Sequence, residues 1–157
     1  MLGIDIGYVL IAGGNEIFTD KFLSAPAVPG AFETVRELVE KRFGANVHLV
    51  SKCSYNMQRK TREWLKDHRF YELTGVSQDH VWFCYERYQK DGICQRLGIT
   101  HFIDDRLEIL GSLTTVGNLY LFQPRTREVQ QFAQYLIKVK QVNSWAEIAR
   151  ELLYSAR

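Results

Sequence analysis

The chain begins with the stretch MLGIDIGYVL (residues 1–10), in which a short apolar run stops at an acidic side chain, Asp5. The stretches VHLVS (residues 47–51) and HFIDD (residues 101–105) have the same form, an apolar run that ends in a serine or in an acidic pair. Neighbouring parallel strands of an open α/β sheet end at one edge, and ligands bind in the crevice there. These stretches therefore predict a site at the carboxyl edge of a sheet.

Ser51, Asp104 and Asp105 would meet Asp5 at that edge, and together these side chains suit phosphate chemistry. A carboxylate can attack phosphorus and form an aspartyl phosphate, provided that a cation reduces its repulsion of the phosphate dianion. Proteins bind Mg²⁺ through one or two carboxylates together with substrate phosphate oxygens. We therefore expect Asp5, Asp104 and Asp105 to hold Mg²⁺. The hydroxyl of Ser51 and the ammonium of Lys90 complete the expected site.

Strand-like runs alternate with helix-like segments along the rest of the chain. Apolar runs at Val81–Cys84 and Asn118–Phe122 predict two further strands, and apolar residues at 3.6-residue spacing predict helices between them. Such alternation produces right-handed β-α-β units and a mostly parallel sheet. We therefore predict an α/β, Rossmann-like, doubly wound sheet flanked by helices, and we expect residues 1–157 to form one domain.

The segments between the strands carry turn and helix signals. The expected elements are, in order, a turn at residues 13–15, an extended stretch at Ile17–Leu23, and helices opened by Gly30, at Met57–His68, at Asp91–Leu97 and at Leu107–Leu113. Lys90 is expected at the entrance to the helix at Asp91–Leu97. Two helices are expected after Phe122, the last one capped by Ser144 and Glu147. A basic helix face at Arg59–Arg69 is expected either to be solvated or to contact a polyanion or an acidic partner.

Composition and charge narrow the functional classes. The 157 residues are 46% hydrophobic and 24% charged, as in a soluble globular domain, and a net charge of +2 does not indicate nucleic acid as a partner, although it leaves one open. Cys53, Cys84 and Cys94 lack closely spaced ligand pairs, which excludes a zinc site of that type and favours reduced thiols. No signal peptide and no run of about 18 apolar residues is found, so we expect no membrane span and a cytoplasmic protein.

The order of these motifs is similar to that of a known superfamily. GIDIGYVL (residues 3–10), HLVS (residues 48–51), Lys90 and HFIDD (residues 101–105) resemble the four motifs of the haloacid dehalogenase-like (HAD) superfamily in order and spacing. HFIDDRLEIL (residues 101–110) looks most like the acidic motif of the deoxyribonucleotide-type 5′-nucleotidases. The resemblance implies a phosphatase of the capless type, without a separate cap domain.

The resemblance also implies a role for each motif residue. Asp5 would be the nucleophile and a Mg²⁺ ligand, and Lys90 would bind the transferred phosphoryl group and restrain Asp5. Ser51 would bind the same phosphoryl group. Asp104 would coordinate the metal directly, while Asp105 would hold either a metal-bound water or Lys90.

Gly7 is the main departure from the superfamily pattern. Phosphatases of the superfamily carry a second aspartate at this position, which protonates the leaving group and then activates water. The backbone carbonyl of Gly7 can still bind the metal, so the loss concerns general acid–base help, worth about 10²–10⁴-fold in rate. Tyr8 is the nearest substitute donor, although its ordinary pKa near 10 makes it a poor base at pH 7. Tyr8, Lys52 and Arg106 are further candidate contacts for an anionic substrate.

Three functions remain open from the sequence. The first is a Mg²⁺-dependent phosphohydrolase that acts on phosphomonoesters through an aspartyl phosphate. The second is a catalytically impaired module that binds phosphate or a partner, and the third is a specialised phosphotransferase or slow hydrolase whose acid comes from elsewhere. The segment from Gly7 to Gly30 has room only for a small flap at Val9–Leu23, and the segment from Ser51 to Lys90 holds one helix and one strand of the core, so we expect an open site. Such a site would take a small or larger phosphorylated substrate, or be covered by a neighbouring subunit.

Overall fold

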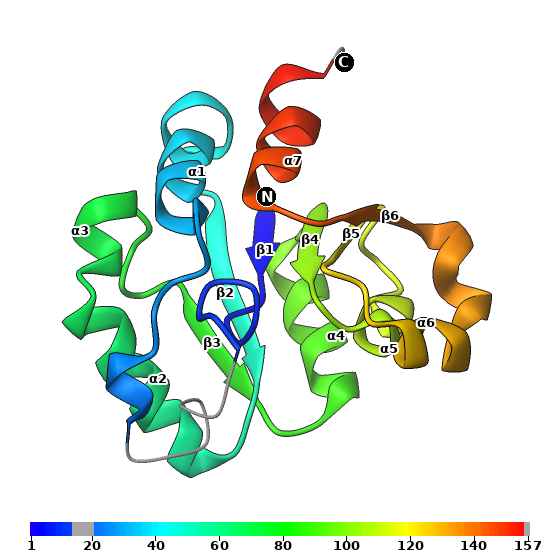
Figure 1. The fold of residues 1–157 in the computed structure, drawn as a ribbon, viewed down its shortest axis with the longest axis horizontal. Helices are drawn as coiled ribbons and strands as arrows, with labels where there is room; N and C mark the ends of the chain where they lie inside the picture. Colours follow the sequence, from blue (N-terminus) through cyan, green and yellow to red (C-terminus); the bar gives the residue numbers. More distant parts are fainter. Residues whose placement is uncertain (14–20, 156–157) are drawn as a thin grey trace.

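A parallel sheet forms the centre of the structure (Figure 1). The computed structural model describes residues 1–13 and 21–155. Its strands are β1 (Leu2–Ile4), β2 (Val47–Lys52), β3 (Val81–Cys84), β4 (His101–Asp104), β5 (Asn118–Phe122) and β6 (Val139–Val142). Within the described residues they form one sheet in the order β3-β2-β1-β4-β5-β6, with every neighbouring pair parallel. This is the doubly wound α/β sheet expected from the sequence, and its strand order reverses between β1 and β4.

Helices connect the strands in the expected alternation. They are α1 (Ala31–Leu38), α2 (Tyr55–Asp67), α3 (Phe70–Thr74), α4 (Arg87–Leu97), α5 (Leu107–Ser112), α6 (Thr126–Gln131) and α7 (Trp145–Ala149). Shorter segments are 3₁₀ turns at Phe22–Ser24 and Ala133–Lys138, and π-helical continuations of α1 and α7 at Val39–Phe43 and Arg150–Tyr154. Among the described residues no separate cap domain is seen.

Two hydrophobic cores lie on the two faces of the sheet. Side chains of α1, α2, α3 and α7 pack in one core with Ile4 of β1, whereas α4 and α5 pack in the other with Leu121 of β5. Neighbouring residues of β2 divide between them, Leu49 in the first core and Val50 in the second. Strands that are covered on both faces are apolar on both faces. The continuous apolar runs in the sequence therefore marked the central strands.

Two buried tryptophans hold the chain that follows β1. The indole Nε1 of Trp145, in α7, donates a hydrogen bond to the carbonyl of Val9 at 2.8 Å. The indole Nε1 of Trp64, in α2, donates to the carbonyl of Ala25 at 2.9 Å. Both side chains are fully buried. The last helix of the described chain thus fixes the loop that carries Gly7.

The structure corrects two of the expected elements. Val139–Val142 forms a strand at the edge of the sheet, where only helices were expected, and Phe70–Thr74 forms an additional short helix, α3. The strand was missed because its two middle residues are polar and exposed, so it lacks the apolar run that marks a central strand. Packing against β5 decides that this segment is extended.

Boundaries near the site also differ from the expectation. Helix α4 begins at Arg87, so Lys90 lies in its first turn and not at its entrance. Phe22–Ser24 is a 3₁₀ turn, whereas an extended stretch was expected at Ile17–Leu23. The rest of that stretch, and most of the expected turn at residues 13–15, lie outside the described residues.

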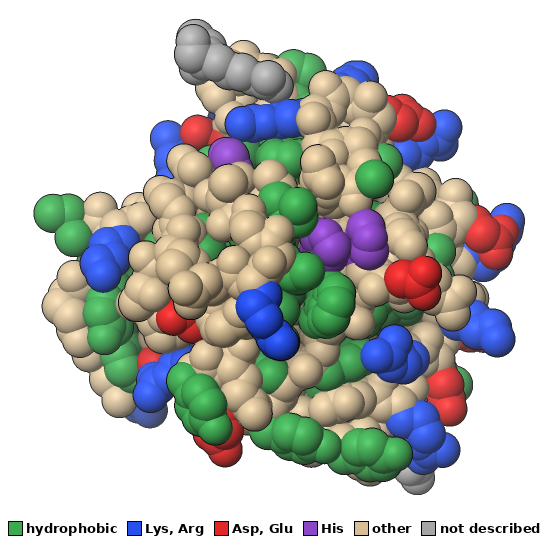
Figure 2. Space-filling view, turned by 180° about the vertical axis from the view of Figure 1, so that it is seen from behind, with side chains coloured by type: hydrophobic (Ala, Val, Ile, Leu, Met, Phe, Trp, Pro, Cys, Tyr) green, Lys and Arg blue, Asp and Glu red, His purple; other side chains and the backbone are tan. Residues whose placement is uncertain are grey.

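Exposed charges of both signs are mixed on the surface. On the face seen in Figure 2, basic and acidic side chains are interspersed and do not gather in one patch. That face therefore offers no extended basic stripe of the kind that binds nucleic acid. Within residues 1–13 and 21–155, none of the helices combines the length and the apolar character needed to cross a bilayer.

Candidate active site

The carboxyl ends of β1 and β4 lie side by side where the strand order reverses. Asp5 directly follows β1, and Asp104 is the last residue of β4. The two strands are in register, with Ile4 opposite Ile103, and the Asp5 amide donates to the Ile103 carbonyl at 2.9 Å. Doubly wound sheets bind ligands in the crevice at this reversal. The first and fourth motifs thus meet where the sequence placed the site.

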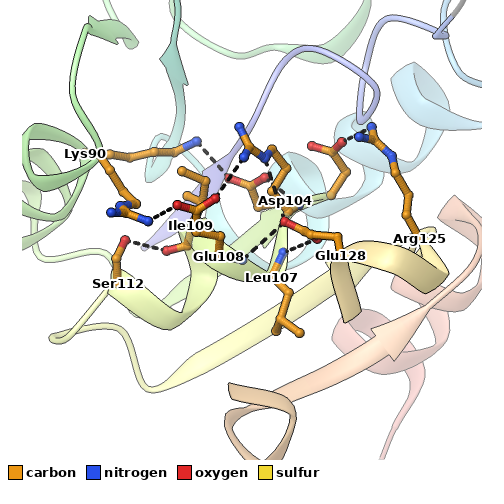
Figure 3. Close-up of polar contacts among 11 residues, drawn as sticks. Lys90, Asp104, Leu107, Glu108, Ile109, Ser112, Arg125 and Glu128 are labelled. Atoms are coloured by element: carbon orange, nitrogen blue, oxygen red, sulfur yellow. Dashed lines mark hydrogen bonds and ion pairs between the residues drawn. The ribbon is translucent and has the colours of Figure 1, made fainter. Parts of the chain in front are cut away.

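Lys90 lies between the two carboxylates. Its Nζ atom is 2.8 Å from Oδ2 of Asp104 and 3.2 Å from Oδ1 of Asp5, and its side chain is only 1% exposed. Figure 3 shows Lys90 reaching toward Asp104 from the side of α4. A buried ammonium needs charged partners, since an unpaired buried charge is strongly unfavourable. The lysine therefore joins the two acidic residues into one ion-pair network.

Asp105 lies beside this network and pairs with Arg125. The Nη2 atom of Arg125 is 2.6 Å from Oδ2 of Asp105, whose side chain is 5% exposed. Figure 3 shows Arg125 on the opposite side of the acidic loop, which we define as Asp104–Asp105, from Lys90. The resemblance implied that Asp105 would hold a metal-bound water or Lys90. In this structure Asp105 pairs with Arg125 and makes no ion pair with Lys90.

Asp5, Asp104 and Asp105 form a set of hard oxygen ligands. One carboxylate oxygen from each lies within 4.8 Å of the other two. Octahedral Mg²⁺ binds oxygens at about 2.0–2.1 Å, so opposite ligands of one ion are about 4.2 Å apart. The separations between the three carboxylates, at most 4.8 Å, are close to this spacing. The residues present therefore fit Mg²⁺.

Burial and mutual repulsion raise the pKa values of two of these carboxyls. Burial, and then the charge of Asp104, raise the pKa of Asp5 to about 6, although Lys90 opposes the shift. Burial, and then the charges of Asp5 and Asp104, raise the pKa of Asp105 to about 9 against the opposing charge of Arg125. Burial lowers the pKa of Lys90, but Asp104 and Asp5 outweigh it and leave that pKa above its ordinary value. Crowded carboxylates of this kind favour a further cation.

A cavity of about 520 Å³ opens beside Asp5. Part of its lining is apolar and comprises Ile6, Tyr8, Ile11, Phe22 and Met57. Three cationic side chains also line it, Lys52, Arg106 and Arg125. Ligand pockets typically combine an apolar lining with a few polar groups that fix orientation. The cavity therefore suits an anionic ligand that carries an apolar portion.

Gly7 leaves open space in this cavity. A Cβ atom added to Gly7 would meet no atom within 4 Å, so a larger residue at this position would find space at its Cβ. Tyr8 has a φ of 65°, a left-handed conformation that costs a non-glycine residue about 1–2 kcal/mol. The guanidinium of Arg125 lies over the Tyr8 ring, 4.7 Å from the centre of that ring. Gly13 also packs so closely against the Tyr8 ring that an added Cβ would overlap it. Packing thus fixes the Tyr8 ring in the cavity wall.

The structure brings the residues singled out in the sequence to two adjoining cavities. Asp5, Gly7, Tyr8, Ser51, Lys52 and Asp105 line the larger one. Lys90 and Asp104 line a smaller one together with Asp5 and Lys52. Helix α2 contributes Met57 and Thr61 to the lining, and its basic face at Arg59–Arg69 does not take part. The cations at the site instead lie at a strand end, as Lys52 does, or shortly after one, as Arg106 and Arg125 do.

Arg125 and Glu128 are lining residues that the sequence reasoning missed. Arg125 immediately precedes α6, and Glu128 lies in its first turn. Neither residue belongs to a motif, and each reads as an ordinary surface charge. The one available signal was position, because both follow β5, whose end lies beside the end of β4.

Comparison with solved structures identifies the fold. The D,D-heptose 1,7-bisphosphate phosphatase from B. bronchiseptica, solved with magnesium and phosphate, matches 99% of this chain and 99% of its own, with a TM-score of 0.71 and 15% identity. A HAD family hydrolase from Deinococcus radiodurans R1, solved with phosphate and sodium, matches 84% of this chain and 61% of its own, with a TM-score of 0.57 and 19% identity. This chain has the haloacid dehalogenase-like fold. At these identities the likeness establishes the fold of the chain and leaves its activity to be proposed.

A curated protein is also similar to this chain in sequence. A provisionally named nucleotidase from Oceanobacillus iheyensis is 26% identical over 130 residues, which cover 78% of this chain and 66% of the relative. The chain thus spans slightly less than two thirds of the length of that protein. No family model matches the chain. The resemblance to the HAD superfamily, stated above from four motifs, is confirmed at the level of the fold.

Proposed function

We propose that this protein is a Mg²⁺-dependent phosphohydrolase that removes the phosphoryl group of a phosphomonoester through Asp5. The observation that carries the proposal is the buried network in which Lys90 joins Asp5 to Asp104 beside an open cavity. A carboxylate nucleophile for phosphorus needs a neighbouring cation and access for the ester, and this arrangement provides both. An ion pair with a purely structural role would need neither the cavity nor the third carboxylate of Asp105.

The nucleophilic step belongs to Asp5 in this proposal. One of its carboxylate oxygens forms a bond to phosphorus while the bond from phosphorus to the ester oxygen breaks, and the alcohol leaves. Water then attacks the phosphorus of the aspartyl phosphate, which releases inorganic phosphate and restores the Asp5 carboxylate. The Gly7 carbonyl, Asp5, Asp104 and Asp105 would hold the metal. When bound, Mg²⁺ supplies the positive charge that offsets the phosphate dianion.

Lys90, Ser51 and Lys52 orient the phosphoryl group in this proposal. Two of the three ammonium protons of Lys90 point to Asp104 and Asp5, which leaves one donor for a phosphoryl oxygen. Ser51 lies near the end of β2, is 7% exposed and lines the larger cavity. Lys52, the next residue, lines both cavities. Donors fixed in this way stabilise the charge that moves across the phosphoryl group in the transition state.

The alcohol part of the substrate would occupy the larger cavity, whose apolar lining favours a leaving group with an aromatic or apolar portion. Nucleoside monophosphates are esters of this class, and the relative named as a nucleotidase supports that choice. Without an aspartate at position 7, the departing alcohol must take its proton from water, from the substrate or from Tyr8, which lines the cavity. We therefore expect slow turnover of alkyl phosphates and faster turnover of aryl phosphates, whose leaving groups need less protonation.

A phosphate-binding module without catalysis is the second candidate function. The open space at Gly7 favours it, because the position that normally handles the proton carries no side chain. In such a module the ion-pair network and Mg²⁺ would bind a phosphorylated ligand without cleaving the ester. Turnover and binding measurements separate the two candidates.

Mg²⁺ dependence is the first test of the hydrolase. Purified protein should release phosphate from nucleoside monophosphates and from p-nitrophenyl phosphate with Mg²⁺ present, and excess EDTA should reduce the rate to background. Calorimetry should detect Mg²⁺ binding that Asp104→Asn removes, because that change takes away a carboxylate ligand. Absence of Mg²⁺-dependent turnover of any phosphomonoester, phosphorylated polynucleotide ends included, would contradict the hydrolase. Retained binding of a phosphate analogue would then favour the module.

Restoring the missing acid is the second test. Gly7→Asp should raise kcat for alkyl phosphates by about 10²–10⁴-fold, the usual value of general acid–base help. The added side chain meets open space, and φ at position 7 lies outside the left-handed region, so the fold should tolerate it. The gain should be smaller for aryl phosphates, and Gly7→Asn should bring none. If Gly7→Asp binds Mg²⁺ but hydrolyses neither ester class faster, the hypothesis that the site lacks only a proton donor is wrong.

A further inference from the structure

The first turn of α6 contacts the acidic loop from outside the ion-pair network. None of the residues of α6 is fully buried, and Val129 is the residue of this helix that packs against a hydrophobic core. Its contacts to the loop are polar and come from Arg125, which precedes the helix, and Glu128 (Figure 3). Arg125 and Glu128 therefore serve to bind the loop and do not pack in a core.

Glu128 supplies the cap that α5 lacks. Arg106, at the start of α5, makes no capping hydrogen bond with its own side chain. The Leu107 amide donates to Oε1 of Glu128 at 2.8 Å, and the Glu108 amide donates to Oε2 at 3.3 Å. The side chain of Glu128 is only 16% exposed and also lies 3.7 Å from Nε of Arg106. One carboxylate thus holds three successive residues at the start of α5.

Those residues directly continue the acidic loop. The Arg106 amide donates to Oδ1 of Asp104 at 3.0 Å, and Oδ2 of the same carboxylate accepts from Lys90. The backbone that orients Asp104 is therefore the backbone that Glu128 holds one residue later. Arg125 adds a second point of attachment, since its guanidinium pairs with Asp105 and stacks on the Tyr8 ring. Through Arg125 the α6 turn also joins the acidic loop to the loop after β1.

We propose that Glu128 is a positioning residue that holds the acidic loop, and with it Asp104 and Asp105, in the observed arrangement, with Arg125 as the second attachment of the same turn. Its consequence for metal binding rests on the proposed function. Residues that hold metal ligands in place typically change metal affinity or activity by about 10–100-fold when they are replaced. If Glu128 were only a helix cap, its loss would disturb α5 and leave Asp104 in place.

Amide hydrogen exchange of the metal-free protein separates these two roles. In Glu128→Gln and Glu128→Asp the Leu107 and Glu108 amides lose their paired acceptor, and a helix cap alone predicts faster exchange at these two positions only. Positioning predicts that the Arg106 amide, which reports the bond to Asp104, also exchanges about tenfold faster. Glu128→Asp keeps the negative charge and Glu128→Gln removes it. Equal exchange rates of the Arg106 amide in the two variants would therefore show that the position of the side chain matters and its charge does not.

Glu147→Gln is the matched control. Glu147 also binds a backbone amide at a helix start, with Oε2 accepting from Asn143 at 2.5 Å near α7. That variant should leave the Arg106 amide and the Mg²⁺ affinity unchanged, whereas both Glu128 variants should weaken Mg²⁺ binding by about 10–100-fold in calorimetry. Unchanged exchange at Arg106 in the Glu128 variants would overturn the positioning role. Failure of the unmodified protein to bind Mg²⁺ would instead overturn the proposed function, and the exchange data would still decide the inference.

Discussion

Asp5→Asn should reduce phosphohydrolase turnover by at least about 10⁴-fold, the largest loss expected for this protein. Asparagine keeps the size and shape of the side chain but cannot attack phosphorus as a carboxylate does. The fold should persist, because the replacement removes a buried negative charge that Asp104 repels and keeps an acceptor for Lys90. Phosphate release with Mg²⁺ present, and a thermal melt of the same sample, measure the two quantities.

Asp79→Asn is the matched control for this loss. Asp79 is an exposed aspartate outside the cavities, so the same chemical change there should leave turnover intact. Trapping the phosphorylated protein with acid during turnover should show label on the unmodified chain and none on Asp5→Asn. An Asp5→Asn variant that keeps more than about 1% of the activity would contradict Asp5 as the nucleophile, because removing a nucleophile costs far more than 10²-fold.

Lys90→Met should both stop turnover and destabilise the fold by about 3–5 kcal/mol, the usual cost of removing one partner from a buried ion pair. Lys90 is 1% exposed and lies between Asp5 and Asp104, so its loss leaves two buried carboxylates facing each other. Urea unfolding of the metal-free protein measures the free energy of unfolding. Mg²⁺ should restore more stability to the variant than to the unmodified protein, because the ion then supplies the missing positive charge.

Lys66→Met is the control for the loss of a lysine. Lys66 is exposed on α2, and such surface substitutions change stability by about 0.5 kcal/mol or less. If Lys90→Met were no less stable than Lys66→Met, the ion-pair network would not be the electrostatic centre of the site. A stable Lys90→Met with full turnover would contradict both the network and the proposed role of the lysine.

Much of the fold followed from local patterns. The central strands are covered on both faces, so their apolar runs stood out, and β3 and β5 have the boundaries that were expected. The edge strand β6 did not stand out, because two of its residues face solvent. The short helix α3 lacked a helical stripe long enough to be recognised. Elements that depend on a neighbour for their conformation were thus the ones that sequence patterns missed.

The site shows the same division. Asp5, Ser51, Asp104 and Asp105 end apolar runs, and parallel strands place such residues at one edge whatever lies between them. Lys90 is not at a strand end, and its selection among nearby polar residues relied on the superfamily resemblance. The structure supports that selection with two ion pairs. Arg125 and Glu128 belong to no motif, and their position after β5 was their one signal, since their partners lie 20 and 21 residues earlier in the chain.

The sequence by itself determined the alternation of strands and helices and placed polar residues at the strand ends, because these patterns depend on neighbours within a few residues. It also showed directly that position 7 is a glycine. Tertiary structure alone decided that Lys90 joins Asp5 to Asp104, that Asp105 pairs with Arg125, and that Glu128 holds the start of α5. Distances of a few ångströms set these interactions, and local sequence patterns do not encode distances between segments that are far apart in the chain. Folding brings the segments together, and the electrostatics of the site follow from that.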